Sequence, residues 1–145
     1  MAAPAGRVWG LVSNLPDMGA YSPENNGGRW QDGSGAQVGA VFRGRNSTGR
    51  RRWSTRSVVT RWDPEVALAF DVSAGGLPVA AWSYELAPTA GGCAVTETWQ
   101  DRRGTAMRIL GRLTTGVSDR ECFTASSIEQ TLQRLKARAE QDSAV

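Results

Sequence analysis

The chain has 145 residues, of which 40% are hydrophobic and 21% are charged, and its formal net charge is +3. This length supports one domain with a core of its own, and the composition excludes a wholly disordered chain. Histidine is absent and the two cysteines, Cys93 and Cys122, lack metal-ligand spacing, which excludes Cys/His zinc sites and histidine-dependent triads. We expect a single domain, residues 1–145, without metal or cofactor.

The compartment follows from hydropathy along the chain. No run of about 18 uninterrupted apolar residues occurs, so no transmembrane segment is predicted. Residues 1–6 contain no hydrophobic run of signal-peptide length, which favours a cytoplasmic protein. In that compartment a disulfide between Cys93 and Cys122 is disfavoured.

The first predicted element is a short helix. Pro4 suits a first helical position, and apolar residues then recur at helical spacing until Pro16 ends the pattern. A second helical turn and a loop are expected over residues 17–28, which end in the turn sequence Asn25-Asn-Gly-Gly28.

From residue 29 the pattern changes to an alternation of apolar and polar residues, which is typical of strands with one buried face. Short connections rich in Gly, Pro and Asn favour an antiparallel meander. The predicted strands are 29–31, 38–46, 53–62, 66–72, 79–86 and 94–100.

A long C-terminal helix is the strongest predicted element. Ser118-Asp119 offers N-cap chemistry, and a helix from there to about residue 141 would span about 30 Å, enough to lie across the whole sheet. The stretch before it, 104–116, is only loosely patterned. The apolar stripe predicted to face the sheet consists of Ala125, Ile128, Leu132, Leu135 and Ala139.

These elements predict an α+β fold, and two features favour an apolar cavity between sheet and helix over a flat sandwich. Small polar residues such as Thr124 and Thr131 flank the helical stripe and fill less space than leucines would. Glu97 and Trp99 share one strand face, so aromatic rings are mixed with a carboxylate, unlike in a plain core.

Six segments in this order carry a resemblance to a known family: AGRVWGLVS (5–13), YSPE (21–24), GAVFRGR (39–45), RW (52–53), VTETW (95–99) and TLQRLK (131–136). Together they are similar to the polyketide cyclase/dehydrase and lipid-transport (SRPBCC) family of the START-like superfamily, in its small actinobacterial form. The resemblance implies a helix-grip fold, in which a curved antiparallel sheet wraps around the long C-terminal helix. It also implies a deep pocket for a lipid, polyketide or similar hydrophobic molecule, sometimes with cyclisation or dehydration inside it.

The resemblance also exposes a difference at the N-terminus. Family members usually begin with a β-strand before the first helix, whereas only residues 1–3 precede Pro4 here. We therefore expect six strands and a missing first strand. Either the natural chain starts further upstream, or the sheet has an exposed edge that could pair with another subunit.

Glu97 is the first candidate for a polar contact or an acid–base group. Burial beside aromatic rings raises the pKa of a carboxyl group towards neutrality. The alternative is a structural ion pair between Glu97 and a strand arginine. A ligand oxygen could accept hydrogen bonds from Arg56, Arg45 or Tyr21. The two arginines could equally face solvent, and Tyr21 could instead pack between the two N-terminal helices. The candidate catalytic set is Glu97, Arg56 and Tyr21, and the predicted ligand contacts are Trp30, Phe42, Arg45, Trp82, Tyr84, Glu97, Trp99, Thr124, Ile128 and Thr131.

The basic run Arg50-Arg-Arg52 lies after turn residues and beside Trp53. A nucleic-acid site is not favoured, because a net charge of +3 is weak for such a protein. A weak contact with an anionic membrane surface is an open alternative. The leading function is the binding or carrying of a hydrophobic small molecule, and the alternative is a polyketide cyclase, aromatase or dehydratase. The sequence leaves monomer and homodimer open.

Overall fold

The computed structural model describes residues 1–31, 35 and 37–141. The chain begins with helix α1 (Ala5–Val12) and the 3₁₀ helix η1 (Leu15–Ala20), and then forms six strands. Helices α2 (Thr105–Thr115) and α3 (Arg120–Gln141) follow the last strand. The strands are β1 (Asn25–Trp30), β2 (Val41–Thr48), β3 (Arg51–Asp63), β4 (Ala67–Ala74), β5 (Leu77–Thr89) and β6 (Gly92–Asp101).

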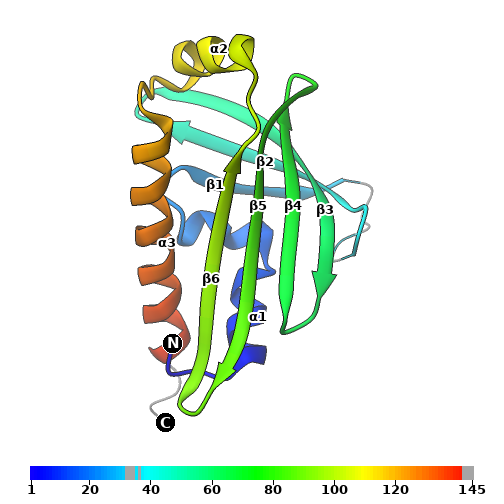
Figure 1. Ribbon diagram of the computed structural model, residues 1–145, viewed down its shortest axis with the longest axis vertical. Coiled ribbons are helices and arrows are strands. Elements are labelled where there is room, and N and C mark those ends of the chain that lie inside the picture. Colours follow the sequence, from blue (N-terminus) through cyan, green and yellow to red (C-terminus); the bar gives the residue numbers. More distant parts are fainter. Residues whose placement is uncertain (32–34, 36, 142–145) are drawn as a thin grey trace.

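The six strands form one antiparallel meander in chain order, as the sequence predicts. The sheet curves, and α3 runs along it while α2 covers one end (Figure 1). No helix in the described ranges is both long and apolar enough to cross a membrane. The fold is therefore the expected α+β arrangement of a curved sheet on a long C-terminal helix.

The prediction for residues 25–28 as a turn is wrong, because they belong to β1. Gly28 lies opposite Gly44 of β2, and the register slips between Asn25 and Gly28. A β-carbon on Gly28 would lie 2.1 Å from the carbonyl oxygen of Arg43, so only glycine allows the two strands to approach this closely. Residues that favour a turn locally are extended here because their backbone pairs with β2.

Helix α3 begins as predicted, since Asp119 Oδ1 accepts a hydrogen bond of 3.0 Å from the backbone N–H of Cys122. The predicted apolar stripe is only half right. Leu135 and Ala139 are buried, whereas Ala125 is exposed and Ile128 is half-buried. The face turned inward in the first half of the helix instead carries small polar residues, which are Thr124, Ser127 and Thr131.

Helix α2 was not predicted, because its apolar residues lie on two faces. Met107 is buried, while Ile109 and Leu113 are exposed. The helix ends at Gly116, whose φ of 74° is the left-handed C-cap conformation that glycine favours.

One apolar core joins α1, the sheet and the C-terminal half of α3. Val8, Leu68 and Leu135 are fully buried in it, and Trp9 meets Trp62 edge to face with ring centroids 5.3 Å apart. Cys93 is a buried free thiol in this core, so it is not paired with Cys122.

The N-terminal residues lie at the edge of the sheet. The Met1 ammonium group donates to the Cys93 carbonyl oxygen at 2.9 Å, and the Cys93 N–H donates to the Met1 carbonyl oxygen at 2.9 Å. These two hydrogen bonds lie on the side of β6 that no strand pairs with, and the described residues form a sheet of six strands.

The outer face of the sheet carries a row of like charges. Arg29, Arg43 and Arg56 lie opposite one another on β1, β2 and β3, and all three are exposed. None of them forms an ion pair with another described residue. Like charges directly across an antiparallel pair destabilise it.

Replacing the central arginine of this row should stabilise the protein. We expect Arg43→Gln to raise the free energy of unfolding by about 0.5 kcal/mol at low ionic strength and by less at high salt. Urea denaturation at both ionic strengths measures the change. The control is Arg61→Gln, which removes an arginine 2.6 Å from Asp63 and should not stabilise. Equal effects of the two substitutions would contradict the explanation.

Candidate functional site

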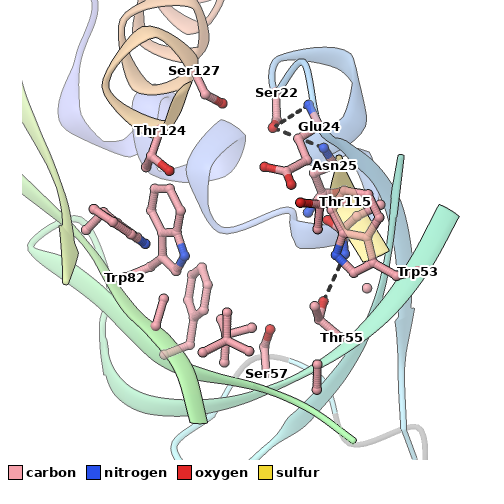
Figure 2. A pocket seen from close by; sticks show the side chains of 18 of the residues that line it. Ser22, Glu24, Asn25, Trp53, Thr55, Ser57, Trp82, Thr115, Thr124 and Ser127 are labelled. Atoms are coloured by element: carbon pink, nitrogen blue, oxygen red, sulfur yellow. Dashed lines mark hydrogen bonds between the residues drawn. The ribbon is translucent and has the colours of Figure 1, made fainter. Parts of the chain in front are cut away.

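A cavity of about 320 Å³ lies between the concave face of the sheet, η1, α2 and the first half of α3 (Figure 2). This volume is at the lower end of the range for sites that hold small molecules. The cavity exists because the helix face above the sheet is built from small side chains. The short side chains on this face are those of Thr124, Ser127 and Thr131, which reach only a short way toward the strands. The Thr131 hydroxyl donates a hydrogen bond of 2.8 Å to the backbone oxygen of Ser127, within the helix itself.

The sheet supplies an aromatic wall. Alternation along each strand turns every second side chain inward, and cross-strand register aligns them. Trp82 lies opposite Trp99, Phe70 lies opposite Trp82, and Trp53 projects from the far side of the cavity (Figure 2). The wall is therefore suited to a flat or branched apolar molecule.

Polar groups gather at one side of the cavity, and most of them are paired with one another. Arg120 Nη1 lies 2.8 and 2.9 Å from the two carboxylate oxygens of Glu24. Ser22 Oγ accepts the backbone N–H of Asn25 at 3.2 Å, which holds the segment that carries Glu24 (Figure 2). These pairs leave few free charges for a ligand.

Glu97 is different, because only one of its oxygens is paired. The Tyr84 hydroxyl donates to Oε1 at 2.7 Å, whereas Oε2 is buried without a hydrogen-bond partner. Burial raises the pKa of Glu97 from 4.5 to about 7, against the lowering effect of the Tyr84 hydrogen bond. Burial and the neighbouring carboxyl group raise the pKa of Tyr84 well above its usual value.

The alternative of a structural ion pair at Glu97 is wrong. Within the described part of the chain its polar partner is the neutral Tyr84 hydroxyl, and no arginine lies at ion-pair distance. Its inward position agrees with the alternation of β6, while its role in binding stays a prediction.

The structure brings part of the predicted contact set together. The predicted residues that line the cavity are Phe42, Trp82, Tyr84, Glu97, Trp99, Thr124 and Thr131. Arg45 and Arg56 do not line it, because the register of β2 and β3 turns Phe42 and Ser57 inward and both arginines outward to solvent.

Three further predicted residues lie outside the cavity. Trp30 packs edge to face on Phe42, with centroids 5.4 Å apart, in the core beside it. Ile128 is half-buried on the side of α3. Tyr21 packs against the core, and its backbone oxygen accepts a hydrogen bond of 3.1 Å from the Arg134 guanidinium group. The candidate catalytic set of Glu97, Arg56 and Tyr21 is therefore not assembled in the cavity.

Other lining residues were missed by sequence reasoning. Trp53 could have been found from strand alternation, because its pair with Asn46 lies two positions beyond the Gly44–Thr55 pair of the inner face and therefore faces inward as well. The ion pair between Glu24 and Arg120 joins residues 96 positions apart and has no local signal. Met107 was missed together with the whole of α2. In the described residues no three potential ligands gather around a point that could hold a metal ion.

A curved antiparallel sheet closed by a long C-terminal helix over an apolar cavity defines the helix-grip class of protein. Within that class, the chain belongs to the family described as polyketide cyclase/dehydrase and lipid transport, whose sequence model matches residues 1–140. Among curated proteins, none matches this chain.

Solved structures of similar fold agree with this assignment. The Polyketide_cyc-like protein Cgl2372 from Corynebacterium glutamicum is 31% identical, with a TM-score of 0.53 over 94% of this chain and 76% of its own. Protein NE0264 from Nitrosomonas europaea is 17% identical, with a TM-score of 0.70 over 100% of this chain and 92% of its own. The di-domain ARO/CYC StfQ of the steffimycin biosynthetic pathway is 17% identical, with a TM-score of 0.74 over 99% of this chain and 49% of its own. The last two similarities concern the fold alone.

Proposed function

We propose that this protein binds and carries a hydrophobic small molecule, of lipid or polyketide type, in the cavity beneath α3. The observation that supports the proposal most directly is the wall itself. Aromatic rings from five strands, β2 to β6, surround the space, and the charged groups beside it are paired with each other rather than directed at a ligand. A site of this kind gains most of its affinity from apolar burial.

The polar contact that we propose for the ligand is Glu97. With a pKa of about 7, its carboxyl group is largely protonated in slightly acidic solution and can donate a hydrogen bond from Oε2 to a carbonyl or hydroxyl oxygen. Tyr84 holds the other carboxyl oxygen at 2.7 Å and so orients the donor. The proposed ligand is therefore apolar over most of its surface with one hydrogen-bond acceptor.

Catalysis in the same cavity is the second candidate, and the pKa of Glu97 is the observation that favours it. A carboxyl group that titrates near neutrality suits general acid–base chemistry. StfQ, described as an ARO/CYC, shows a similar fold. Carriage is the better supported proposal, because Arg45, Arg56 and Tyr21 do not line the cavity to steady a developing enolate oxygen.

Native mass spectrometry of the protein purified from its own cells tests the proposal. We expect a co-purifying small molecule, and we expect the isolated protein to bind the neutral apolar probe N-phenyl-1-naphthylamine with increased probe fluorescence. Bare protein in every preparation, together with no probe binding, would contradict carriage.

The Glu97→Gln variant separates the two candidates. A carrier should retain the bound mass, since glutamine keeps the shape of the wall and a hydrogen-bond donor. An enzyme should instead lose turnover by about 100-fold or more on the molecule identified by mass spectrometry. Glu85→Gln, an exposed change on the neighbouring strand, is the matched control.

A further inference from the structure

The outward face of α2 is unusual for a surface helix. Ile109 and Leu113 are 60% and 68% exposed, and their spacing of four residues places them side by side on the helix. Arg108 and Arg112 run beside them on the same exposed face. This face is both apolar and basic.

Exposed apolar side chains gather at this end of the molecule. Leu77 begins β5 next to α2, since the backbone N–H of Arg102 just before α2 donates to the Val79 carbonyl oxygen at 3.0 Å. Single exposed apolar residues are ordinary, but a group of them indicates a surface that contacts something. Of the large apolar residues that are exposed in the described ranges, those at this end are Leu77, Ile109, Leu110 and Leu113, and those elsewhere are Val38 and Val66.

Arginines outnumber the carboxylates at this end, where Asp119 and Glu121 at the start of α3 are also exposed. The β2–β3 turn carries three consecutive arginines, 50–52, and reaches α2, where Arg51 Nη1 donates to the Leu113 carbonyl oxygen. Neither this turn nor α2 contains an acidic residue. The carboxylate of Asp101, just before α2, forms an ion pair of 2.8 Å with Arg103 and lies 3.9 Å from Arg108, so it is already paired. We call Leu77, residues 50–52 and the exposed face of α2 the α2 surface.

We propose that the α2 surface docks the protein onto an anionic lipid bilayer. Aliphatic side chains flanked by arginines on one helix face are suited to the boundary between headgroups and acyl chains. A nucleic acid would be expected to use exposed aromatic rings for stacking, and none of the large exposed apolar residues in the described ranges is aromatic. The chemistry therefore favours a membrane surface.

Docking in this way would place one end of the cavity against the bilayer. Met107 and Leu110 of α2 line the cavity, while Ile109 and Leu113 of the same helix face outward. A change in the position of this helix would connect the cavity with the acyl chains. The docking itself depends only on the outer face, so it can be tested separately from what the cavity holds.

Flotation with phosphatidylcholine vesicles, with and without phosphatidylglycerol, tests the proposal. We expect binding to the anionic vesicles, weaker binding at high salt, and little binding to pure phosphatidylcholine. Ile109→Ser with Leu113→Ser should lower partitioning about tenfold through lost apolar insertion. Arg108→Gln with Arg112→Gln should also lower it about tenfold, and only on anionic vesicles.

The matched control is Val66→Ser, an exposed apolar change in the β3–β4 turn, which should leave partitioning unchanged. Circular dichroism checks that every variant keeps its fold. Loss of partitioning in both double variants but not in the control supports docking through α2. Vesicle binding that neither double variant weakens would overturn the proposal. So would the absence of vesicle binding alongside tight binding to single-stranded DNA that the arginine variant removes.

Discussion

Replacing Glu97 with glutamine is expected to raise the free energy of unfolding by about 3 kcal/mol at about pH 8, and to leave it nearly unchanged at about pH 4. The reason is the buried carboxyl group. Burial raises its pKa in the folded protein from 4.5 to about 7, so the folded state binds this proton more tightly than the unfolded state.

The direction of the pH effect follows from that difference. The stabilisation by the Glu97 proton is fully present below about pH 4.5, and it is lost as pH rises through about 7. Above that value the folded protein carries a buried charge beside the Tyr84 hydroxyl, with Oε2 unpaired. Glutamine has no charge at either pH and nearly the same shape, so it removes this cost.

Urea denaturation of the parent and Glu97→Gln proteins across this pH range measures the effect. The variant should show a flatter dependence of stability on pH between about 4.5 and 7. Glu85→Gln, on the exposed face of β5, should change stability by only about 0.5 kcal/mol at any pH. Parallel pH profiles for the parent and the Glu97 variant would show that Glu97 is solvated in the folded protein.

Filling the cavity from α3 should abolish binding without unfolding the protein. Thr131 is 3% exposed and lines the cavity from the helix side. In a space of about 320 Å³, an indole at this position would occupy the volume next to the aromatic wall. We expect Thr131→Trp to weaken binding of N-phenyl-1-naphthylamine by about 100-fold, as measured by fluorescence titration.

The control for this variant places the same residue on the opposite face of the helix. Gln133 is exposed, so Gln133→Trp should bind the probe as the parent does. Ser127→Leu provides a smaller filling change from the next turn of α3, should the indole disturb the fold. Undiminished binding in both filling variants would place the probe site outside the cavity.

Much of the fold was predictable because local patterns determine it. Alternating polarity gave the order of six strands, and the N-cap at Asp119 gave the start of α3. The family resemblance added the curvature of the sheet, and it agreed with the cavity that the small polar residues of α3 and the mixed face of β6 had already favoured. The inward position of Glu97 followed from the same alternation, since it shares a face with Trp99.

The sequence pattern thus determined the α+β class, the strand order and the face on which Glu97 lies, because periods of two and of 3.6 residues are local properties, whereas the helix-grip class was implied by the family resemblance. Only the tertiary structure decided which side of α3 faces the sheet, since Thr124 rather than Ala125 meets the cavity. It also decided that Tyr84, and not an arginine, is the partner of Glu97. Helix rotation and side-chain partners depend on contacts between elements distant in the chain, and a single sequence carries no local signal for them.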